Sequence, residues 1–214
     1  VTNMSHMFNG VQKLFIDFIS WDTQNVEDMS YMFANINFLH SYVITTLNNW
    51  NTTNVKNMSH MFYNNHEYLS YIGIDFNTRI VNLKNTSRYG NQFTAWNTTN
   101  VEDMSYMFAN EELGSSTGSK GNISNWDTSQ VTNMEGMFKN SRHFYLNVKD
   151  WKTENVINMS HMFNGASSFN ANISGWTTDQ VTDMNNMFNG ASSFNQDISG
   201  WTTDQVTDMN NMFN

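Results

Sequence analysis

The sequence of 214 residues contains neither cysteine nor proline. Without cysteine there are no disulfides and no thiolate metal sites, and the redox compartment cannot be read from the sequence. Without proline every residue keeps its backbone N–H donor, which suits a regular and repetitive backbone. Long apolar runs are missing as well, so no segment is expected to span a membrane.

Positive charge is also scarce in this chain. Lys and Arg total 10 against 19 Asp and Glu, which gives a formal net charge of -9. Because nucleic acids and anionic lipid surfaces are bound through clustered Lys and Arg, the composition argues against both as partners. The 39% hydrophobic content is sufficient for a buried core, so we expect a folded chain rather than a disordered one.

An internal repeat organises the whole chain. The pattern W-x-T-x-[NQ]-V-x-x-M-x-x-M-F contains all 16 methionines and all 7 tryptophans. Its base period is 25 residues, with insertions of 4, 21 and 5 residues after the second, third and fourth copies. We therefore predict a single repeat domain over 1–214, a fragment of a longer array, with insertions near 39–46, 66–90 and 111–121. The valines in register are Val1, Val26, Val55, Val101, Val131, Val156, Val181 and Val206.

One segment of each unit has helical periodicity. Val26, Met29, Met32 and Phe33 are spaced i, i+3, i+6 and i+7, which places them on one face of a helix. A Thr two residues after each Trp is a suitable N-cap, a Gly or Asn after Met-Phe suits a left-handed C-cap, and an Asp at the third helical position favours the helix dipole. We predict a short amphipathic helix with a buried apolar face. The core representatives are Trp21, Val26, Met29, Met32, Phe33, Trp176, Val181, Met184, Met187 and Phe188.

The remainder of the unit predicts a strand. An apolar residue stands three positions before every Trp, as at Phe18 and Ile173. Strands pair at about 4.8 Å and helices pack at about 8–10 Å, so the array should curve with its strands inside. The predicted fold class is an α/β repeat solenoid, leucine-rich-repeat-like, with one short strand and one short helix per 25-residue unit and about eight units. The amides that precede each Val, from Asn25 to Gln205, are expected to form a buried ladder.

The unit resembles a known repeat. The string W-[DN]-T-[ST]-N-V-x-[ND]-M-S-x-M-F-x-x-A-x-x-F-N-x-x-I-S-x-W is similar to the repeat of BspA-like bacterial surface proteins, a leucine-rich-repeat-type family. The clearest copy is "WTTDQVTDMNNMFNGASSFNQDISGW". The resemblance implies a secreted or surface-attached protein that mediates adhesion or protein–protein interaction without catalysis. Its partners would be other proteins, either host or matrix proteins or copies of the chain itself, and it needs no cofactor.

Two groups of residues are candidates for binding. The insertion between Phe62 and Trp96 combines aromatic and basic residues, a composition typical of binding hot spots, although a hairpin that only covers the edge of the array is an equal alternative. Tyr31 and Tyr106 form the second candidate, on the outward stripe of the predicted helices. The candidates in the insertion are Tyr68, Tyr71, Phe76, Arg79, Lys84 and Arg88.

Other chemistries have simpler explanations. Paired methionines can bind Cu(I), but here they share a face with Val and Phe, which indicates core packing. His6, His60 and His161 occupy the same unit position and are interpreted as surface histidines rather than metal ligands. Asp179 with Asp183, and Asp204 with Asp208, could place carboxylates near one another on successive units for Ca²⁺, but no loop with a glycine turn accompanies them, which indicates a solvated face. We expect no metal, and no enzyme, because no constellation of catalytic residues is unique to one place.

Two classes of function therefore remain. The first is a non-enzymatic surface or extracellular repeat protein that mediates adhesion or protein–protein interaction. The alternative is a structural subunit of a filament, surface layer or virion surface that is built from stacked repeats and associates with its own copies.

Overall fold

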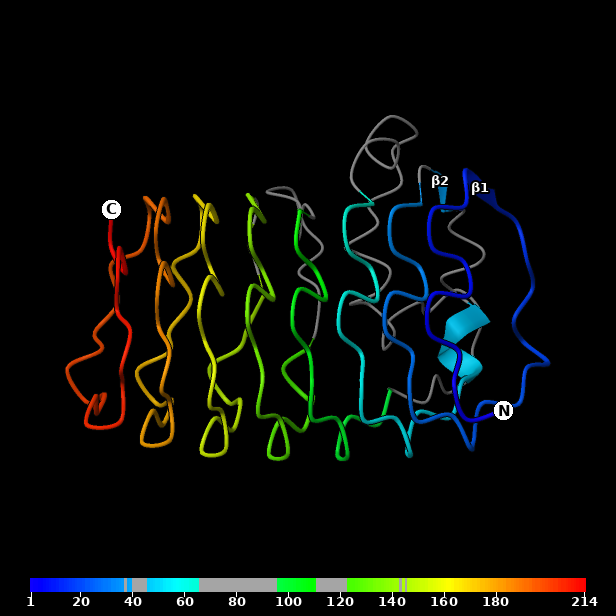
Figure 1. Ribbon diagram of the computed structural model, residues 1–214, viewed down its shortest axis with the longest axis horizontal. Coiled ribbons are helices and arrows are strands. Elements are labelled where there is room, and N and C mark those ends of the chain that lie inside the picture. The colour runs from blue at the N-terminus through cyan, green and yellow to red at the C-terminus, as the bar shows by residue number, and fades with distance from the viewer. Residues whose placement is uncertain (37, 40–45, 66–95, 111–122, 143, 145) are drawn as a thin grey trace.

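The chain winds into coils that follow one another along the long axis of the molecule, with the two termini at opposite ends (Figure 1). Its named elements are strand β1 (Lys13–Leu14), strand β2 (Phe38–Leu39) and the 3-10 helix η1 (Leu47–Asn49). β1 pairs with β2 in parallel, with Lys13 opposite Phe38. The structure, a computed structural model, describes residues 1–36, 38–39, 46–65, 96–110, 123–142, 144 and 146–214.

Isolated parallel bridges join each coil to the next. The bridged residue is always an Asn or Asp two positions after the Val of the repeat. Equivalent positions therefore lie opposite one another in successive coils, and this register continues across the three insertions. One repeat unit is one coil of the stack. The bridged residues, in order, are Asn3, Asp28, Asn57, Asp103, Asn133, Asn158, Asp183 and Asp208.

The segment from the Val to the Phe of each unit is not a helix in the described coils, so this prediction was wrong. The backbone N–H groups of Met29, Tyr31 and Phe33 donate to carbonyls of the next coil at 2.9, 2.9 and 3.0 Å. Between them, the N–H of Met32 donates to the carbonyl of Met29 and closes a tight turn. Alternate residues thus bond to a neighbouring coil, whereas a helix would bond each residue to the one four before it.

Two local features explain why the helix does not form. The side chain of Asp28 accepts a hydrogen bond from the backbone N–H of Ser30 at 2.8 Å, a turn that competes with helical bonding. The residue between the two methionines has a left-handed backbone, with φ between 49° and 58° in all eight coils. The Asp that was expected to favour a helix dipole therefore fixes a turn. The left-handed residues are His6, Tyr31, His60, Tyr106, Gly136, His161, Asn186 and Asn211.

The expected caps have other functions in the stack. The buried hydroxyl of Thr153 donates to the carbonyl of Thr177 and accepts from its N–H, both at 2.8 Å, so this Thr connects two coils. The Gly or Asn after each Met-Phe does adopt the predicted left-handed conformation, as at Asn35 (φ 55°) and Gly165 (φ 71°). These residues shape turns, however, rather than end helices.

In the described copies the residue three positions before Trp does not lie in a strand, so this prediction was wrong as well. At Phe18 the chain makes a turn, with the N–H of Trp21 donating to the carbonyl of Phe18 at 3.1 Å. That carbonyl also accepts the indole N–H of Trp50 in the following coil, at 3.3 Å. With neither a helix nor a strand at the expected places, the leucine-rich-repeat-like α/β unit and its curved array do not fit the structure. The coils are built from turns that bond to one another in parallel.

The interior of the stack contains the apolar side chains of the repeat. Successive Phe rings from Phe8 to Phe213 stack at centroid distances between 5.4 and 6.1 Å. Trp21 is half-buried against this core. The methionine side chains of the inner coils are buried in the same core, whereas Met7 and Met209 in the end coils are exposed. The other core representatives named above are all buried: Val26, Met29, Met32, Phe33, Trp176, Val181, Met184, Met187 and Phe188.

The amides that were expected to form a buried ladder differ from the prediction both in where they lie and in the groups they bind. Asn54 is exposed, and its side-chain amide donates to the backbone carbonyl of Gln24 in the preceding coil at 2.6 Å. Asn155 makes the same bond to Ser129 at 2.7 Å. These amides thus join coils at the surface by binding carbonyls, because the residues beside the Val face outward.

Candidate functional site

Four rings stack on one another along the outside of the first four coils, and we call them the aromatic column: His6, Tyr31, His60 and Tyr106. The ring centroids of neighbours are 4.5, 4.2 and 4.8 Å apart, with interplanar angles of 8°, 9° and 20°. His6 is exposed and the other three rings are half-buried. Because each ring covers the faces of its neighbours, the column presents mainly ring edges to solvent.

The backbone positions this column. Each of its residues is the left-handed residue of the Met-x-x-Met turn, and the coil-to-coil bonds place these turns directly above one another. The N–H of His60, for example, donates to the carbonyl of Ser105 in the next coil at 2.8 Å. Residues with a Cβ rarely adopt this conformation, and Tyr is strained there by comparison with Gly, Asn or His. The stacked rings therefore occupy a position that the fold, rather than residue preference, has set.

The column ends at the fifth coil. Gly136 takes the equivalent position there, and a Cβ on it would overlap the ring of Tyr106. The Tyr106 hydroxyl donates to Glu135 Oε1 at 2.7 Å, and Lys139 Nζ lies 6.0 Å from the centroid of the same ring. Burial raises the pKa of Tyr106, and the hydrogen bond to Glu135 raises it further. The last ring is therefore held as a neutral phenol between a carboxylate and an ammonium group.

The histidines at this unit position have different surroundings. His6 Nδ1 lies 3.1 Å from the Asn9 side-chain amide, and His161 Nδ1 lies 3.4 Å from that of Asn164. His60 has Tyr63 at the corresponding place, with the ring centroids 5.4 Å apart. Burial lowers the pKa of His60 and that of His161. The three copies thus share a backbone position but differ in whether an amide contacts the imidazole.

Tyr31 and Tyr106, two of the residues proposed for binding from the sequence, are brought together on one face through His60. The histidines of the column were interpreted only as surface residues. The signal for them is the order His, Tyr, His, Tyr in the first four copies, which becomes a column only when the coils are in register. The six candidates in the long insertion lie outside the described residues: Tyr68, Tyr71, Phe76, Arg79, Lys84 and Arg88.

Comparison with known families places the chain. A family described as "Mycoplasma protein of unknown function, DUF285" matches residues 1–86, 78–117 and 113–214. The chain belongs to this family. No curated protein and no solved structure matches it.

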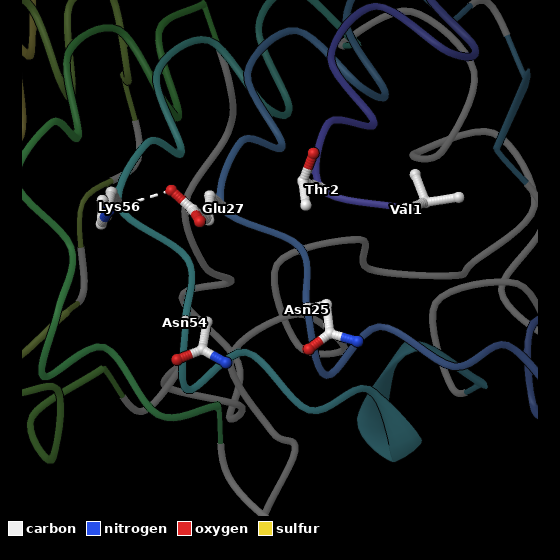
Figure 2. Close-up of a pocket in the computed structure, with 6 residues that line it drawn as sticks. All are labelled: Val1, Thr2, Asn25, Glu27, Asn54 and Lys56. Atoms are coloured by element: carbon white, nitrogen blue, oxygen red, sulfur yellow. Dashed lines mark hydrogen bonds and ion pairs between the residues drawn. The ribbon is translucent and has the colours of Figure 1, made fainter.

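A shallow hollow of about 440 Å³ lies beside the first coil of this DUF285 chain (Figure 2). Across it, Lys56 Nζ pairs with Glu27 Oε2 at 2.9 Å, and both side chains are more than half exposed. The six lining residues supply one ion pair and several amide and hydroxyl groups, with no nucleophile beside a general base. The hollow therefore gives no argument for catalysis. Its lining residues are Val1, Thr2, Asn25, Glu27, Asn54 and Lys56.

Metal-binding groups do not converge in the described ranges of the DUF285 chain. No cluster of three or more His, Asp and Glu side chains there could hold a metal ion. Asp183 and Asp208 do lie opposite each other in neighbouring coils, but their Oδ1 atoms accept the backbone N–H groups of Asn185 and Asn210. Among the described residues, no helix has the length and apolar character needed to cross a membrane.

Proposed function

We propose that this DUF285 chain is a non-enzymatic surface or extracellular protein that mediates adhesion or protein–protein interaction through the face that carries the aromatic column. One observation supports the proposal. Tyr stands at the left-handed position in two of the first four coils, where three of the last four coils have Gly or Asn. Strain of this kind persists at functional sites more often than elsewhere, since it costs stability of order 1–3 kcal/mol per residue.

The composition of the face agrees with a binding function. Tyr side chains present an apolar body and a hydroxyl at little conformational cost, and they are common in protein interfaces. Tyr63 and Tyr106 are both half-buried, and Tyr106 lies next to the carboxylate of Glu135 and the ammonium group of Lys139. The resemblance to BspA-like surface repeats points in the same direction.

The chain offers a matched way to test this proposal. Asn occupies the same left-handed position at Asn186 and Asn211, so the triple variant Tyr31→Asn, His60→Asn, Tyr106→Asn should keep the backbone. We expect the wild-type protein to bind at least one of a panel of immobilised matrix proteins, collagen, fibronectin and laminin, in surface plasmon resonance. The triple variant should bind at least about tenfold more weakly.

The control changes another face by the same number of residues. Glu27→Gln, Lys56→Gln and Glu102→Gln replace exposed side chains one position after the Val, and this variant should bind like the wild type. Equal circular dichroism spectra would establish that all three proteins are folded. The proposal fails if the wild type binds none of the panel, or if the triple variant binds as tightly as the wild type.

A structural subunit of a stacked assembly is the second candidate. The parallel bonds between coils favour it, because they repeat at every coil and form a pattern that can extend along the axis. Sedimentation velocity over a range of concentrations tests this candidate. Growth into ordered polymers would support it, and a concentration-independent monomer would exclude it for this chain.

A further inference from the structure

His60 lies in the middle of the aromatic column, between rings from both neighbouring coils. Its imidazole centroid is 4.2 Å from that of Tyr31 and 4.8 Å from that of Tyr106. The Nδ1 atom is buried and has no hydrogen-bond partner among the described residues. A buried polar atom without a partner is unusual in a folded protein and calls for a physical reason.

The sequence supplies the reason why this atom has no partner. His6 and His161 are each followed three residues later by an Asn. The side-chain amide of that Asn lies beside Nδ1, at 3.1 Å from His6 and 3.4 Å from His161. Tyr63 stands at that place in the His60 coil and presents a ring instead of an amide. His60 is therefore the copy in which an aromatic residue has replaced the group that would pair with Nδ1.

Protonation changes what this site must accommodate. A neutral imidazole can keep Nδ1 as a bare lone pair and carry its proton on Nε2, whereas an imidazolium carries an N–H at both nitrogens. At His60 the new Nδ1–H would be buried without a hydrogen-bond acceptor among the described residues. An amide, as at Asn9 and Asn164, can turn its oxygen toward such an N–H and accept it.

The charged and titratable groups around His60 act in both directions. Asp103 and Glu135 in the following coils favour the cation, while His6 disfavours it. The neutral phenols of Tyr31, Tyr63 and Tyr106 surround the ring, and Lys139 lies over the far ring. Burial is the largest effect and exceeds the attraction of the two carboxylates, so the pKa of His60 lies below its ordinary value.

We propose that His60 is a pH-sensitive joint of the aromatic column: when its imidazole gains a proton, the ring leaves the space between Tyr31 and Tyr106, and the column opens at this coil. Because the folded state disfavours the protonated form, the unfolded chain binds more protons as the pH falls below about 6.5. The stability that depends on His60 is complete above that pH and decreases as the pH falls toward the pKa of the folded protein. Above neutral pH the face stays closed and rigid.

Two measurements on the whole chain test the joint. Nuclear magnetic resonance of the imidazole C–H groups follows the titration of His60, and we expect it to protonate below the ordinary histidine value of about 6.5. As it does so, the ring signals of Tyr31 and Tyr106 should move toward those of the His60→Asn variant. Urea unfolding at about pH 7.5 and about pH 5 reports the stability change, which should be smaller in His60→Asn than in the wild type.

A second variant restores the missing amide. Tyr63→Asn recreates the His–Asn pair of the other copies, so it should shift the titration of His60 to higher pH and reduce the loss of stability at low pH. His6→Asn is the control and should keep most of the pH dependence, because His6 is the smallest of the influences on His60. The joint is refuted if His60 titrates at or above the ordinary histidine value of about 6.5, if the Tyr signals do not follow it, or if His60→Asn loses as much stability as the wild type.

Discussion

The first four coils and the last four coils share one backbone but differ in the side chain that it carries at the left-handed position. In the first half this residue is His or Tyr with φ between 53° and 58°, and in the second half it is Gly, His or Asn with φ between 49° and 57°. The same angles with such different residues show that hydrogen bonds between coils impose the conformation. Residue types that favour the left-handed backbone occur at this position only where the side chain has no other function.

The two halves also differ in their buried side chains. The Phe column continues through both halves, but in the later coils Phe144, Phe169 and Phe194 add further rings that contact it. Phe169 lies 3.6 Å from Phe163 and 5.6 Å from Phe194, measured between ring centroids. In the first coil, Leu14 of β1 occupies the equivalent sequence position. The second half is therefore more uniform inside, and the first half is more specialised outside.

The largest effect should come from the core that both halves share. Phe33→Ala and Phe163→Ala each remove a fully buried ring, one from each half, and each should lower the free energy of unfolding by about 3–5 kcal/mol. Urea unfolding measures both. Phe213→Ala is the control, because that ring is 58% exposed and should matter much less. A loss below about 1 kcal/mol at Phe33 or Phe163 would show that the two halves do not have a common core.

The buried threonines give the next largest effect. Thr52→Val and Thr153→Val remove hydroxyls that both donate to and accept from the next coil, at distances between 2.8 and 3.0 Å. We expect each to cost about 1–3 kcal/mol, because the hydroxyl is buried and a backbone N–H and a carbonyl of the next coil lose their partner. The exposed Thr207, changed to Val, should cost less than about 0.5 kcal/mol. Equal costs at Thr207 and Thr153 would contradict a role for buried bonds between coils.

Gly136 marks the border between the halves. Gly136→Ala should destabilise the chain by about 1–2 kcal/mol through its left-handed backbone alone, and further because its Cβ would overlap the Tyr106 ring. Gly190→Ala is the matched control, since its φ is also positive but its Cβ would make only ordinary contacts at 3.5 Å.

The difference in unfolding free energy between these two variants measures the effect of the Tyr106 ring. A double-mutant cycle of Gly136→Ala with Tyr106→Asn, measured by thermal and urea unfolding, should recover most of that difference because the ring is then absent. If Gly136→Ala and Gly190→Ala lower the free energy of unfolding by the same amount, the Tyr106 ring does not restrict the residue at position 136.

The smallest effect is expected inside the aromatic column. Tyr31→Asn removes two ring stacks, each worth about 0.5–1.5 kcal/mol, but it places a residue that tolerates the left-handed backbone. The net change in the free energy of unfolding should stay within about 1 kcal/mol. Tyr31→Ala loses the stacks without relief of the strain, so it should be the less stable of the two. The reverse order would mean that the column does not carry backbone strain.

Part of this structure could be predicted from the sequence. The repeat locates the buried side chains, because apolar residues at fixed spacing must face the same interior whether the segment is a helix or a coil. The left-handed backbone of Asn35 and Gly165 could also be predicted, because only Gly and Asn occur at that place in the repeat. The spacing of Val26, Met29, Met32 and Phe33 did not distinguish a helix from a turn-rich coil, because both bury that set.

The helix prediction failed for reasons that one unit cannot show. Ser30 pairs with the side chain of Asp28 within a single unit, and this pairing is compatible with a helix start as well as with a turn. The bonds from Met29 and Tyr31 need a second coil as acceptor. Periodicity within one unit therefore favours the helix, because a helix forms its backbone hydrogen bonds within the same segment.

The sequence by itself determined the unit, its register and its buried residues, because repetition and apolar spacing depend only on the order of residues. The tertiary structure decided the conformation of each unit and the function of its outward side chains. Backbone groups that could bond within a helix bond between coils instead, since stacking brings equivalent groups into register along the whole array. The same stacking turns two histidines and two tyrosines, 25 to 46 residues apart in the sequence, into one column.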